Sequence, residues 1–581
     1  MRDVTDVIEG VHELLVKALY GPDAKTREGI SKVLHELLSG HSVILSAPPG
    51  YGKTTIPYCL GYLAATKPHL CQRAIHVLPL RSIIEDCYSR LFYKNGQPKA
   101  PPLIGGVVAK QSLDASGSPW LQRKLVLTTL DTFTMCSMRL PPREVRLIAR
   151  GYSLGHGLLA RAAILASSVI FDEVHLFMEE GGKMASAFSA LLRWLGAFST
   201  PICVMSATLP RPIETFLKAE LGSGGKISVF KYGEDFRDKE FEAQRLQAAE
   251  GLRTRRPRKG DIDVVVKEAI EAYESYEKVL VVLNTVADCI KAAKAINSGG
   301  YNSVILHGRL VNSQRSERLK ALRGRRWLAV CTQVVEAGVD ISALYTITDA
   351  APPCALVQRV GRTLRSKEDV CREGVISIIL DEGAFANGTY KGIYDASLVR
   401  ASFEYLLEHY GDMMWHLPKY PDRPGYEDFI GACYDRANFE VVIDRPLARE
   451  LTSLLRGMVI MGRILSTLES LGGSFVRDEP LVLGFVNHLG LKEGDEIDNE
   501  SQRKLREWQL PLSARDVFYV WGHETLAIAL EFRSGKYLVK RERIRSTKEL
   551  IRKLLSGRIY GILIPPEIYD EKLGLIIGRG G

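Results

Sequence analysis

The chain of 581 residues has no apolar run long enough to cross a bilayer, and its first residues, MRDVTDVIEG, have no secretory character. Its ten cysteines are scattered and include no Cys-x-x-Cys pair, which argues against a zinc ribbon and against a disulfide framework. The sequence also lacks internal repeats and long low-complexity tracts. We therefore expect a globular protein of the cytoplasm without a membrane segment.

The composition indicates an ordinary soluble protein. A chain of 581 residues is too long for one hydrophobic core and predicts about three domains. Hydrophobic residues at 46% and charged residues at 25% are typical of globular proteins. The net charge of +9 favours a polyanionic partner, but over this length the signal is weak.

Short apolar runs alternate with helical patterns in two stretches of the chain. Between about residues 42 and 208, the runs SVILSA, RAIHVLPL, KLVLTTL, SSVIFDE and PICVMSA read as buried parallel strands. A second array starts near residue 263, with KVLVVLN, NSVILHG, RWLAVCT, ALYTITDA and GVISIIL. This alternation predicts an α/β fold with two tandem doubly wound parallel-sheet domains, whose sites gather at the carboxyl ends of the strands.

We predict four segments: a first domain at 1–215, a linker at 216–262, a second domain at 263–385 and a mixed accessory domain at 386–581. The basic stretch RTRRPRK in the linker could touch nucleic acid, but a solvated connector is the favoured interpretation. The accessory domain contains a probable hairpin, TLAIALEFRSGKYLVKRERI, with its turn at Ser534–Gly535. The final LIIGRGG imitates an RNA-binding KH loop, but no helix follows it, and we reject that match.

The stretch SAPPGYGKTT, residues 46–55, has the pattern of a phosphate-binding loop. Gly50 and Gly52 let backbone N–H groups approach phosphate closely. Lys53 supplies a charge for the β- and γ-phosphates, and Thr54 a hydroxyl for Mg²⁺. The strict pattern has glycine at the position of Ala47. We expect the nucleotide to be bound by Ala47, Pro48, Pro49, Gly50, Tyr51, Gly52, Lys53, Thr54 and Thr55.

The segment VIFDEVH places an acidic pair just beyond a buried strand, about 120 residues after the phosphate loop. Asp172 suits Mg²⁺ binding, with Thr54 as its partner ligand, and Glu173 can orient and deprotonate the attacking water. His175 either relays the nucleotide state to the next motif or simply packs there. The tripeptide that follows the strand PICVM is a candidate coupling element: Ser206, Ala207 and Thr208.

The second array contains TQVVEAGVDIS and QRVGRTLR. Arg359, Arg362 and Arg365 are spaced i, i+3, i+6, so we expect them to share a helix face. Such a face opposite a phosphate loop can neutralise transition-state charge, which is worth roughly 10³–10⁵ in rate. We assign Gln358, Arg362 and Arg365 to catalysis together with Lys53, Asp172 and Glu173, and expect Gly338 and Asp340 to contact the nucleotide.

A nucleotide held between two arrays pulls them together on binding and lets them part on hydrolysis. A ligand chain that is bound by both arrays is then moved stepwise. The residues therefore favour a motor over a kinase.

The ordered motifs resemble those of superfamily 2 helicases over about residues 25 to 385: APPGYGKT, LPLRSII, TTLDTF, DEVH, SAT, VVLNT, ILHGR, TQVVEAGVDIS and QRVGRTLR. This resemblance implies two RecA-like domains, with ATP and Mg²⁺ as cofactors. Within the superfamily, the chain resembles the CRISPR-associated helicase of type I interference systems. The segments that carry this narrower resemblance are HGLLARAAILASSVIFDEVH, VLNTVADCIKAAKAI, ILHGRLVNSQR, APPCALVQRVGRTLR and YDEKLGL.

Members of that family translocate on single-stranded DNA, generally 3′ to 5′, and are recruited by an RNA-guided surveillance complex. They usually carry an N-terminal histidine–aspartate (HD) nuclease. Here about forty residues precede the phosphate loop, which is too few for a domain, and no His-Asp dipeptide occurs. The resemblance therefore implies a helicase subunit that works with a separate HD nuclease subunit. No glutamine precedes Gln72, so the residue that reads adenine in many such helicases is missing upstream of the loop, and Arg27 lies near its place.

The resemblance also implies a track for the nucleic-acid backbone. Its residues would be Arg81, Thr129 and Asp131 in the first domain, and Asn284, Thr285, Arg309 and Thr332 in the second. Capping or turn chemistry is the alternative for each, and it is favoured for Asp131, whose charge repels phosphate. Two other functions remain open: an RNA-remodelling or DNA-repair helicase of the same superfamily, and a recruitment subunit switched by nucleotide.

Overall fold

The computed structural model describes residues 2–93, 96–112, 115, 117–149, 151–179, 181–222, 224–336, 339–457, 459–478, 481–521, 524–531 and 536–576. Gly338, the Ser534–Gly535 turn and the final residues 577–581 therefore lie outside the described residues. No helix in the described part combines the length and the apolar character that a membrane crossing requires.

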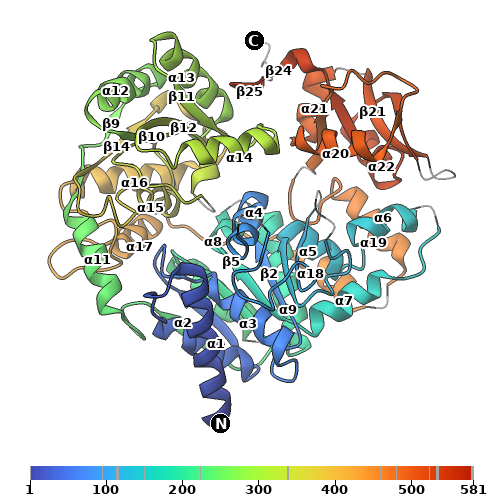
Figure 1. Cartoon of the computed structure of the whole chain (residues 1–581), viewed down its shortest axis with the longest axis horizontal. Helices are drawn as coiled ribbons and strands as arrows, with labels where there is room; N and C mark the ends of the chain where they lie inside the picture. The colour runs from blue at the N-terminus through green and yellow to red at the C-terminus, as the bar shows by residue number, and fades with distance from the viewer. Residues whose placement is uncertain are drawn as a thin grey trace. The chain divides into compact units, whose positions relative to one another are not determined.

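The chain folds into two compact units (Figure 1). Unit 1 comprises residues 1–142, 155–260 and 336–458, and unit 2 comprises 143–154, 261–335 and 459–581. These units cut the chain differently from the four segments predicted from the sequence. The second array is divided at residue 335, and residues 386–458 join unit 1.

A seven-stranded parallel sheet forms the centre of unit 1, with the order β3-β4-β2-β5-β6-β1-β7. Its strands are β1 (Ser42–Ser46), β2 (Ala74–Leu78), β3 (Val108–Gln111), β4 (Leu125–Thr129), β5 (Ser168–Asp172), β6 (Ile202–Ser206) and β7 (Ile227–Lys231). The five predicted runs became β1, β2, β4, β5 and β6. β2, β4, β5 and β6 are buried along their whole length, which explains why they read as continuous apolar runs.

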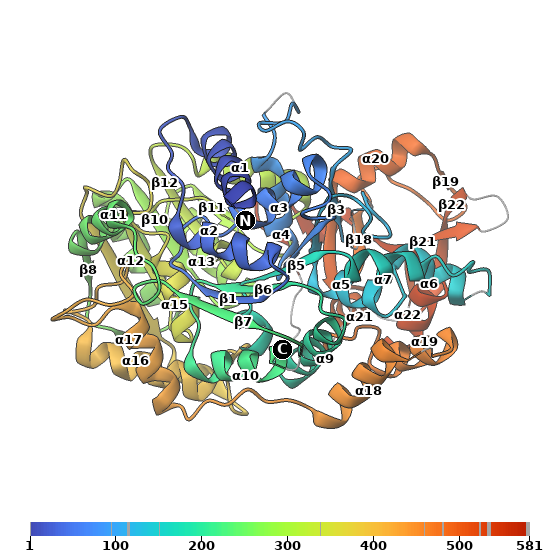
Figure 2. The ribbon, with the colours of Figure 1, turned by 90° about the horizontal axis from the view of Figure 1, so that it is seen from below.

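Helices cover both faces of this sheet. Figure 2 shows it between α1 to α3 on one side and α9 and α10 on the other. The helices of unit 1 in this part of the chain are α1 (Arg2–Tyr20), α2 (Glu28–Leu38), α3 (Thr55–Thr66), α4 (Arg81–Arg90), α5 (Leu130–Ser137), α7 (Gly157–Leu165), α8 (His175–Glu179), α9 (Gly182–Ala197) and α10 (Arg211–Leu221), whereas all but the first residue of α6 (Pro142–Ala149) belong to unit 2. The apolar faces of α1, α2 and α3 close one core with β1.

The segment 216–262, predicted to be a linker with some local structure, contains one helix and three short strands. β7 pairs with β1 at the edge of the first sheet. After helix α11 (Lys239–Glu250), the short strands β8 (Leu252–Thr254) and β9 (Arg258–Lys259) pair with β14. β7 is a half-buried edge strand of five residues, and β8 and β9 are shorter and largely polar, so the strand structure of all three depends on a distant partner.

The strands predicted for the second array are all present. Unit 2 contains β10 (Lys278–Val282), β11 (Ser303–Leu306) and β12 (Trp327–Cys331), which pair in parallel in the order β11-β12-β10, with α12 (Ile262–Ser275), α13 (Val286–Ser298) and α14 (Asn312–Ala321). Unit 1 contains the parallel pair β13 (Tyr345–Asp349) and β14 (Gly374–Leu380), with α15 (Pro353–Val360), α16 (Ala396–His409), α17 (Tyr426–Arg436) and α18 (Arg445–Arg456). A small antiparallel sheet follows β14: β15 (Phe385–Ala386), β16 (Thr389–Tyr390) and β17 (Tyr394–Asp395).

The C-terminal part of unit 2 is a mixed six-stranded sheet with the order β19-β22-β21-β23-β18-β20. Its strands are β18 (Leu481–Val486), β19 (Glu496–Ile497), β20 (Gln509–Ser513), β21 (Glu524–Glu531), β22 (Lys536–Arg543) and β23 (Gly561–Ile564). α19 (Met461–Ser470), α20 (Asn499–Glu507), α21 (Ala514–Trp521) and α22 (Thr547–Leu555) accompany it, and β24 (Tyr569–Asp570) pairs with β25 (Gly574–Leu575). β21 and β22 form the predicted antiparallel hairpin.

Candidate active site

The phosphate loop joins β1 to α3. Gly50 and Gly52 have φ values of 81° and 95°, a left-handed conformation that favours glycine. The backbone N–H of Ala47 donates to Ser206 O at 3.2 Å, which ties the start of the loop to the end of β6. The sequence therefore places its two glycines where the loop needs them.

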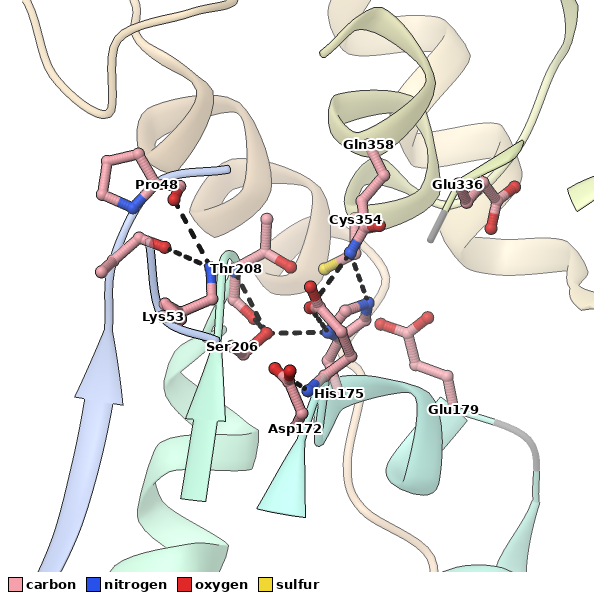
Figure 3. A network of polar contacts seen from close by, with 12 residues as sticks. Pro48, Lys53, Asp172, His175, Glu179, Ser206, Thr208, Glu336, Cys354 and Gln358 are labelled. Carbon is pink, nitrogen blue, oxygen red and sulfur yellow. Dashed lines mark hydrogen bonds and ion pairs between the residues drawn. The ribbon is translucent and has the colours of Figure 1, made fainter. Parts of the chain in front are cut away.

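Lys53 lies in this loop with 7% of its surface exposed. Its Nζ donates to Ala47 O at 2.8 Å and to Pro48 O at 3.4 Å (Figure 3). Burial lowers the pKa of Lys53, and the carboxylates of Glu173 and Asp172 oppose that shift. A bound phosphate would take the place of the two carbonyl acceptors and would stabilise the charged form further.

Asp172 ends β5 and is held on both of its oxygens. Oδ1 accepts from the backbone N–H of Glu173 at 3.0 Å, and Oδ2 lies 3.2 Å from His76 Nε2. His76 is on β2, the neighbouring strand, and is completely buried. These contacts orient a carboxylate that is 6% exposed. No sequence motif predicted His76, which is a single histidine inside an apolar run.

Glu173 adopts a left-handed backbone with φ of 50°, which is costly for a residue with a side chain. Its Oε2 accepts from Gln358 Nε2 at 3.3 Å. Gln358 is on α15, so a side chain from the second array reaches the glutamate predicted to activate water. The structure thus brings together two residues that lie 185 positions apart in the chain.

His175 continues this network on the other side of Gln358 (Figure 3). Gln358 Nε2 lies 3.3 Å from His175 Nε2, and His175 Nδ1 lies 2.8 Å from Ser206 Oγ. Ser206 in turn donates to Thr208 O at 2.8 Å. Neutral His175 with its proton on Nδ1 satisfies each of these contacts. His175, Ser206 and Thr208, which were predicted to couple the site, therefore form one hydrogen-bonded chain with Gln358, and Ala207 lines the cavity beside it.

A cavity of about 550 Å³ opens over the phosphate loop within unit 1. The residues that line it include most of those predicted to bind the nucleotide or to act on it: Pro49, Gly50, Gly52, Lys53, Thr54, Asp172, Glu173, Asp340, Gln358, Arg362 and Arg365. Tyr51 instead packs against aromatic residues behind the loop, 5.4 Å from the rings of Tyr232 and Phe236.

The three arginines do not share a helix face, so that prediction is wrong. α15 ends at Val360, with Gly361 as its C-cap. Arg359 is completely buried and pairs with Glu336 at 2.7 Å and with Thr348 Oγ1 at 2.9 Å. Arg359 is therefore a core residue, whereas Arg362 and Arg365 lie on the turn beyond the helix.

Arg362 and Arg365 both line the cavity. Arg362 donates to Glu336 O at 2.6 Å and to Val339 O at 2.7 Å. Its burial and the nearby Arg365 lower the pKa of Arg362. Arg365 Nε lies 3.2 Å from Asp340 Oδ1, so the second cation is already opposed by a carboxylate.

Helix α4 adds a charged pair to the cavity, whereas the sequence pattern predicted only that this segment is helical. Asp86 and Arg90 line the cavity and are 2.7 Å apart. Burial raises the pKa of Asp340, but Arg365, Arg90 and Arg362 outweigh that effect and lower it. The four-residue spacing of Asp86 and Arg90 in RSIIEDCYSR predicts that they share a helix face, but it does not predict that this face lines the cavity.

The predicted track residues take varied positions. Thr129 accepts from the backbone N–H of Thr132 at 3.3 Å, and Thr285 from that of Asp288 at 3.0 Å, so each caps a helix. Arg309 pairs with Asp516 of α21 at 2.9 Å, and Thr332 is buried, its N–H donating to Leu306 O at 3.0 Å. The remaining residues are Arg81 at the start of α4, Asp131 in the first turn of α5, and Asn284, whose carbonyl accepts from Gln333.

Two family models match the chain. The DEAD/DEAH box helicase model covers residues 29–216, and the model of the C-terminal part of the CRISPR-associated nuclease/helicase Cas3 covers residues 275–368. The fold defines the class: an α/β protein with two parallel RecA-like sheets and a mixed C-terminal sheet domain, whose first sheet lies in the part of the chain that the DEAD/DEAH box helicase model matches.

Within this class, the chain is similar to Cas3 proteins. It is 34% identical over 218 residues to a putative CRISPR-associated nuclease/helicase Cas3 of Myxococcus xanthus, which covers 36% of this chain and 26% of that protein. T. fusca Cas3 in the AMPPNP crystal structure has a TM-score of 0.57 at 17% identity, covering 86% of this chain and 65% of that one. A chain of a CRISPR RNA-guided surveillance complex in a pre-nicking state has a TM-score of 0.52 at 16% identity, covering 83% and 62%. The chain thus spans about a quarter of the curated relative and about two thirds of the solved structures.

Proposed function

We propose that this chain is an ATP-dependent translocase on single-stranded DNA that unwinds target DNA in the 3′ to 5′ direction in CRISPR type I interference. The observation that carries the proposal is the contact of Gln358 with both Glu173 and His175. It joins the second array to the water-activating glutamate, so that hydrolysis and movement of the arrays are linked.

The donor set suits Mg²⁺ held together with a nucleotide. The Thr54 hydroxyl and the Asp172 carboxylate are hard oxygen ligands of the kind Mg²⁺ prefers. In the described part of the chain, no group of three His, Cys, Asp or Glu side chains gathers to hold a metal by itself. Thr54 and Asp172 would hold the ion together with the phosphates of the nucleotide, and the ion would supply positive charge that offsets the phosphate charge.

The side chains divide the hydrolysis between them. Lys53 binds the β- and γ-phosphates, and Glu173 accepts a proton from the water that attacks the γ-phosphorus. Gln358 holds the Glu173 carboxylate in place, and Arg362 stabilises the charge that develops on the transferred phosphoryl group. The hydrogen bond between His175 and Ser206 couples the state of the bound nucleotide to the carboxyl end of β6.

The proposed partners follow from the similarity to Cas3 proteins. We propose an RNA-guided surveillance complex as the recruiter and a separate HD nuclease subunit as the enzyme that cuts the strand. The chain binds backbone phosphates without reading bases, through the predicted track of hydroxyls and cations.

The decisive experiment measures ATP hydrolysis with and without single-stranded DNA, in the wild type and in Lys53→Ala. We expect DNA to stimulate hydrolysis and Lys53→Ala to abolish it. An ATP hydrolysis rate that is the same with and without nucleic acid would refute the proposed translocase. Stronger stimulation and unwinding with paired RNA would instead assign the chain to RNA remodelling.

A further inference from the structure

Helix α11 contributes side chains to the cavity that are not assigned to phosphate or metal binding. Phe241, Gln244 and Arg245 of this helix line the cavity together with Tyr20 and Arg27. The phosphate end of the cavity is defined by the loop that leads into α3. An aromatic and amide-bearing surface is what a nucleobase requires, because bases stack on rings and pair through their edges.

Arg245 fastens α11 to the phosphate loop. Its Nη2 donates to Pro49 O at 3.0 Å, and its guanidinium lies 5.1 Å from the ring centre of Phe241. A Cβ atom at Gly50 would collide with the Arg245 guanidinium, so that glycine also makes room for the arginine. Gln244, the preceding residue, is thereby held at the rim of the loop that binds the triphosphate.

Arg27 cannot take the place of the missing upstream glutamine. Its guanidinium forms an ion pair with Asp238, the N-cap of α11, and lies 5.3 Å from the ring centre of Phe241. A guanidinium only donates hydrogen bonds, whereas the N6/N7 edge of adenine offers one donor and one acceptor. Arg27 therefore matches the two acceptors of guanine, N7 and O6, better than it matches adenine.

Gln244 has the matching chemistry. Its amide provides both a donor and an acceptor, and the side chain is exposed to the cavity. Among the residues that the structure describes, the Gln244 amide has no hydrogen-bond partner. We propose that Gln244 is the specificity-determining residue that reads the N6/N7 edge of adenine, so that base recognition comes from α11 instead of the segment before the phosphate loop. This inference rests on the proposed function, in which ATP is the nucleotide that is hydrolysed.

The test compares KM values for ATP and for 7-deaza-ATP, which lacks N7, in DNA-stimulated hydrolysis. In the wild type, we expect the KM for 7-deaza-ATP to be about tenfold higher than that for ATP, because the analogue loses one of the two hydrogen bonds to the amide and leaves its N–H group unpaired. Gln244→Ala should raise the KM for ATP about tenfold, remove the difference between the two nucleotides and leave kcat unchanged. Gln247→Ala is the matched control, because Gln247 is exposed on the same helix and does not line the cavity.

Three outcomes would overturn the inference: equal KM values for the two nucleotides in the wild type, discrimination that survives Gln244→Ala, or a lower KM for GTP than for ATP. The last result would assign the base contact to Arg27. None of these outcomes bears on the proposed translocase, which fails if hydrolysis does not respond to single-stranded DNA or if Lys53→Ala retains it. The two ideas are therefore separable in one set of assays.

Discussion

Gln358 Nε2 lies 3.3 Å from Glu173 Oε2, and the same nitrogen lies 3.3 Å from His175 Nε2. One amide group from α15 thus contacts both functional residues of the DEVH segment. A displacement of α15 by an ångström or two would break both contacts at once, which is how a small movement becomes an on–off change in catalysis.

Replacing Gln358 with alanine tests this relationship. We expect kcat for ATP hydrolysis to fall about 10²-fold, because the carboxylate of Glu173 is no longer positioned, while nucleotide binding is retained. Steady-state kinetics and a fluorescent-nucleotide titration measure the two effects, with Gln247→Ala as the control. An unchanged kcat would show that Glu173 does not depend on the second array.

Arg362→Ala should separate catalysis from binding. Arg362 faces the cavity and opposes developing charge, so its loss should lower kcat by about 10³-fold or more with little change in nucleotide affinity. Arg325→Ala serves as a control, because that side chain is 90% exposed. An equal loss of affinity and turnover would refute the role of Arg362 in the transition state.

Arg359→Ala should instead destabilise the fold. Arg359 is completely buried against Glu336, and its removal leaves a buried carboxylate without its cation. We expect a loss of about 3–5 kcal/mol in the free energy of unfolding, measured by urea denaturation. Arg359→Met combined with Glu336→Leu should recover part of this loss, because a matched apolar pair leaves no charge unpaired. Full stability of the single variant would contradict the buried ion pair.

Arg309 and Asp516 offer a test of the predicted DNA track. Asp516→Asn weakens their ion pair and should raise the affinity for single-stranded DNA, whereas Arg309→Ala should lower it and reduce the salt slope by about 0.7. The double variant should behave like Arg309→Ala alone. Binding titrations at several salt concentrations measure this, and an Asp516→Asn effect that persists without Arg309 would remove Arg309 from the track.

Glu427 predicts a pH dependence of stability. Burial raises the pKa of Glu427 from 4.5 to about 7, an effect that Lys419 opposes and Glu234 increases. Because the folded state holds this proton more tightly than the unfolded state, stability is highest below pH 4.5 for this group and falls as the pH rises towards 7. Glu427→Gln should therefore raise the Tm at pH 8 and leave it nearly unchanged at pH 4.5. An equal shift at both pH values would exclude titration of Glu427 as the cause.

Much of the site could be predicted because its chemistry is local. The phosphate loop needs glycines at two left-handed positions beside a lysine, and an acidic pair must follow a buried strand. These requirements leave a pattern that short-range reasoning recognises. The parallel strands were equally visible, because burial on both faces makes their sequences continuously apolar.

Other features depended on partners far away in the chain. Arg359 and Arg362 belong to the same i, i+3 pattern of arginines. Arg359 is nevertheless buried against Glu336 and Arg362 lines the cavity, because the helix ends between them at Gly361. The strands β7, β8 and β9 are short and only partly buried, and their structure depends on pairing with β1 and β14.

The sequence by itself predicted the two βα arrays, the phosphate loop and the acidic pair Asp172–Glu173, because each is specified by residues within one turn or one strand. Only the tertiary structure decided that Arg362 and Arg365 line the cavity while Arg359 is buried, that α11 reaches the cavity with Gln244, and that Gln358 contacts Glu173. Arg245 contacts Pro49 and Gln358 contacts Glu173 over 196 and 185 positions of the chain, and Arg359 contacts Glu336 over 23, so no local pattern encodes these contacts.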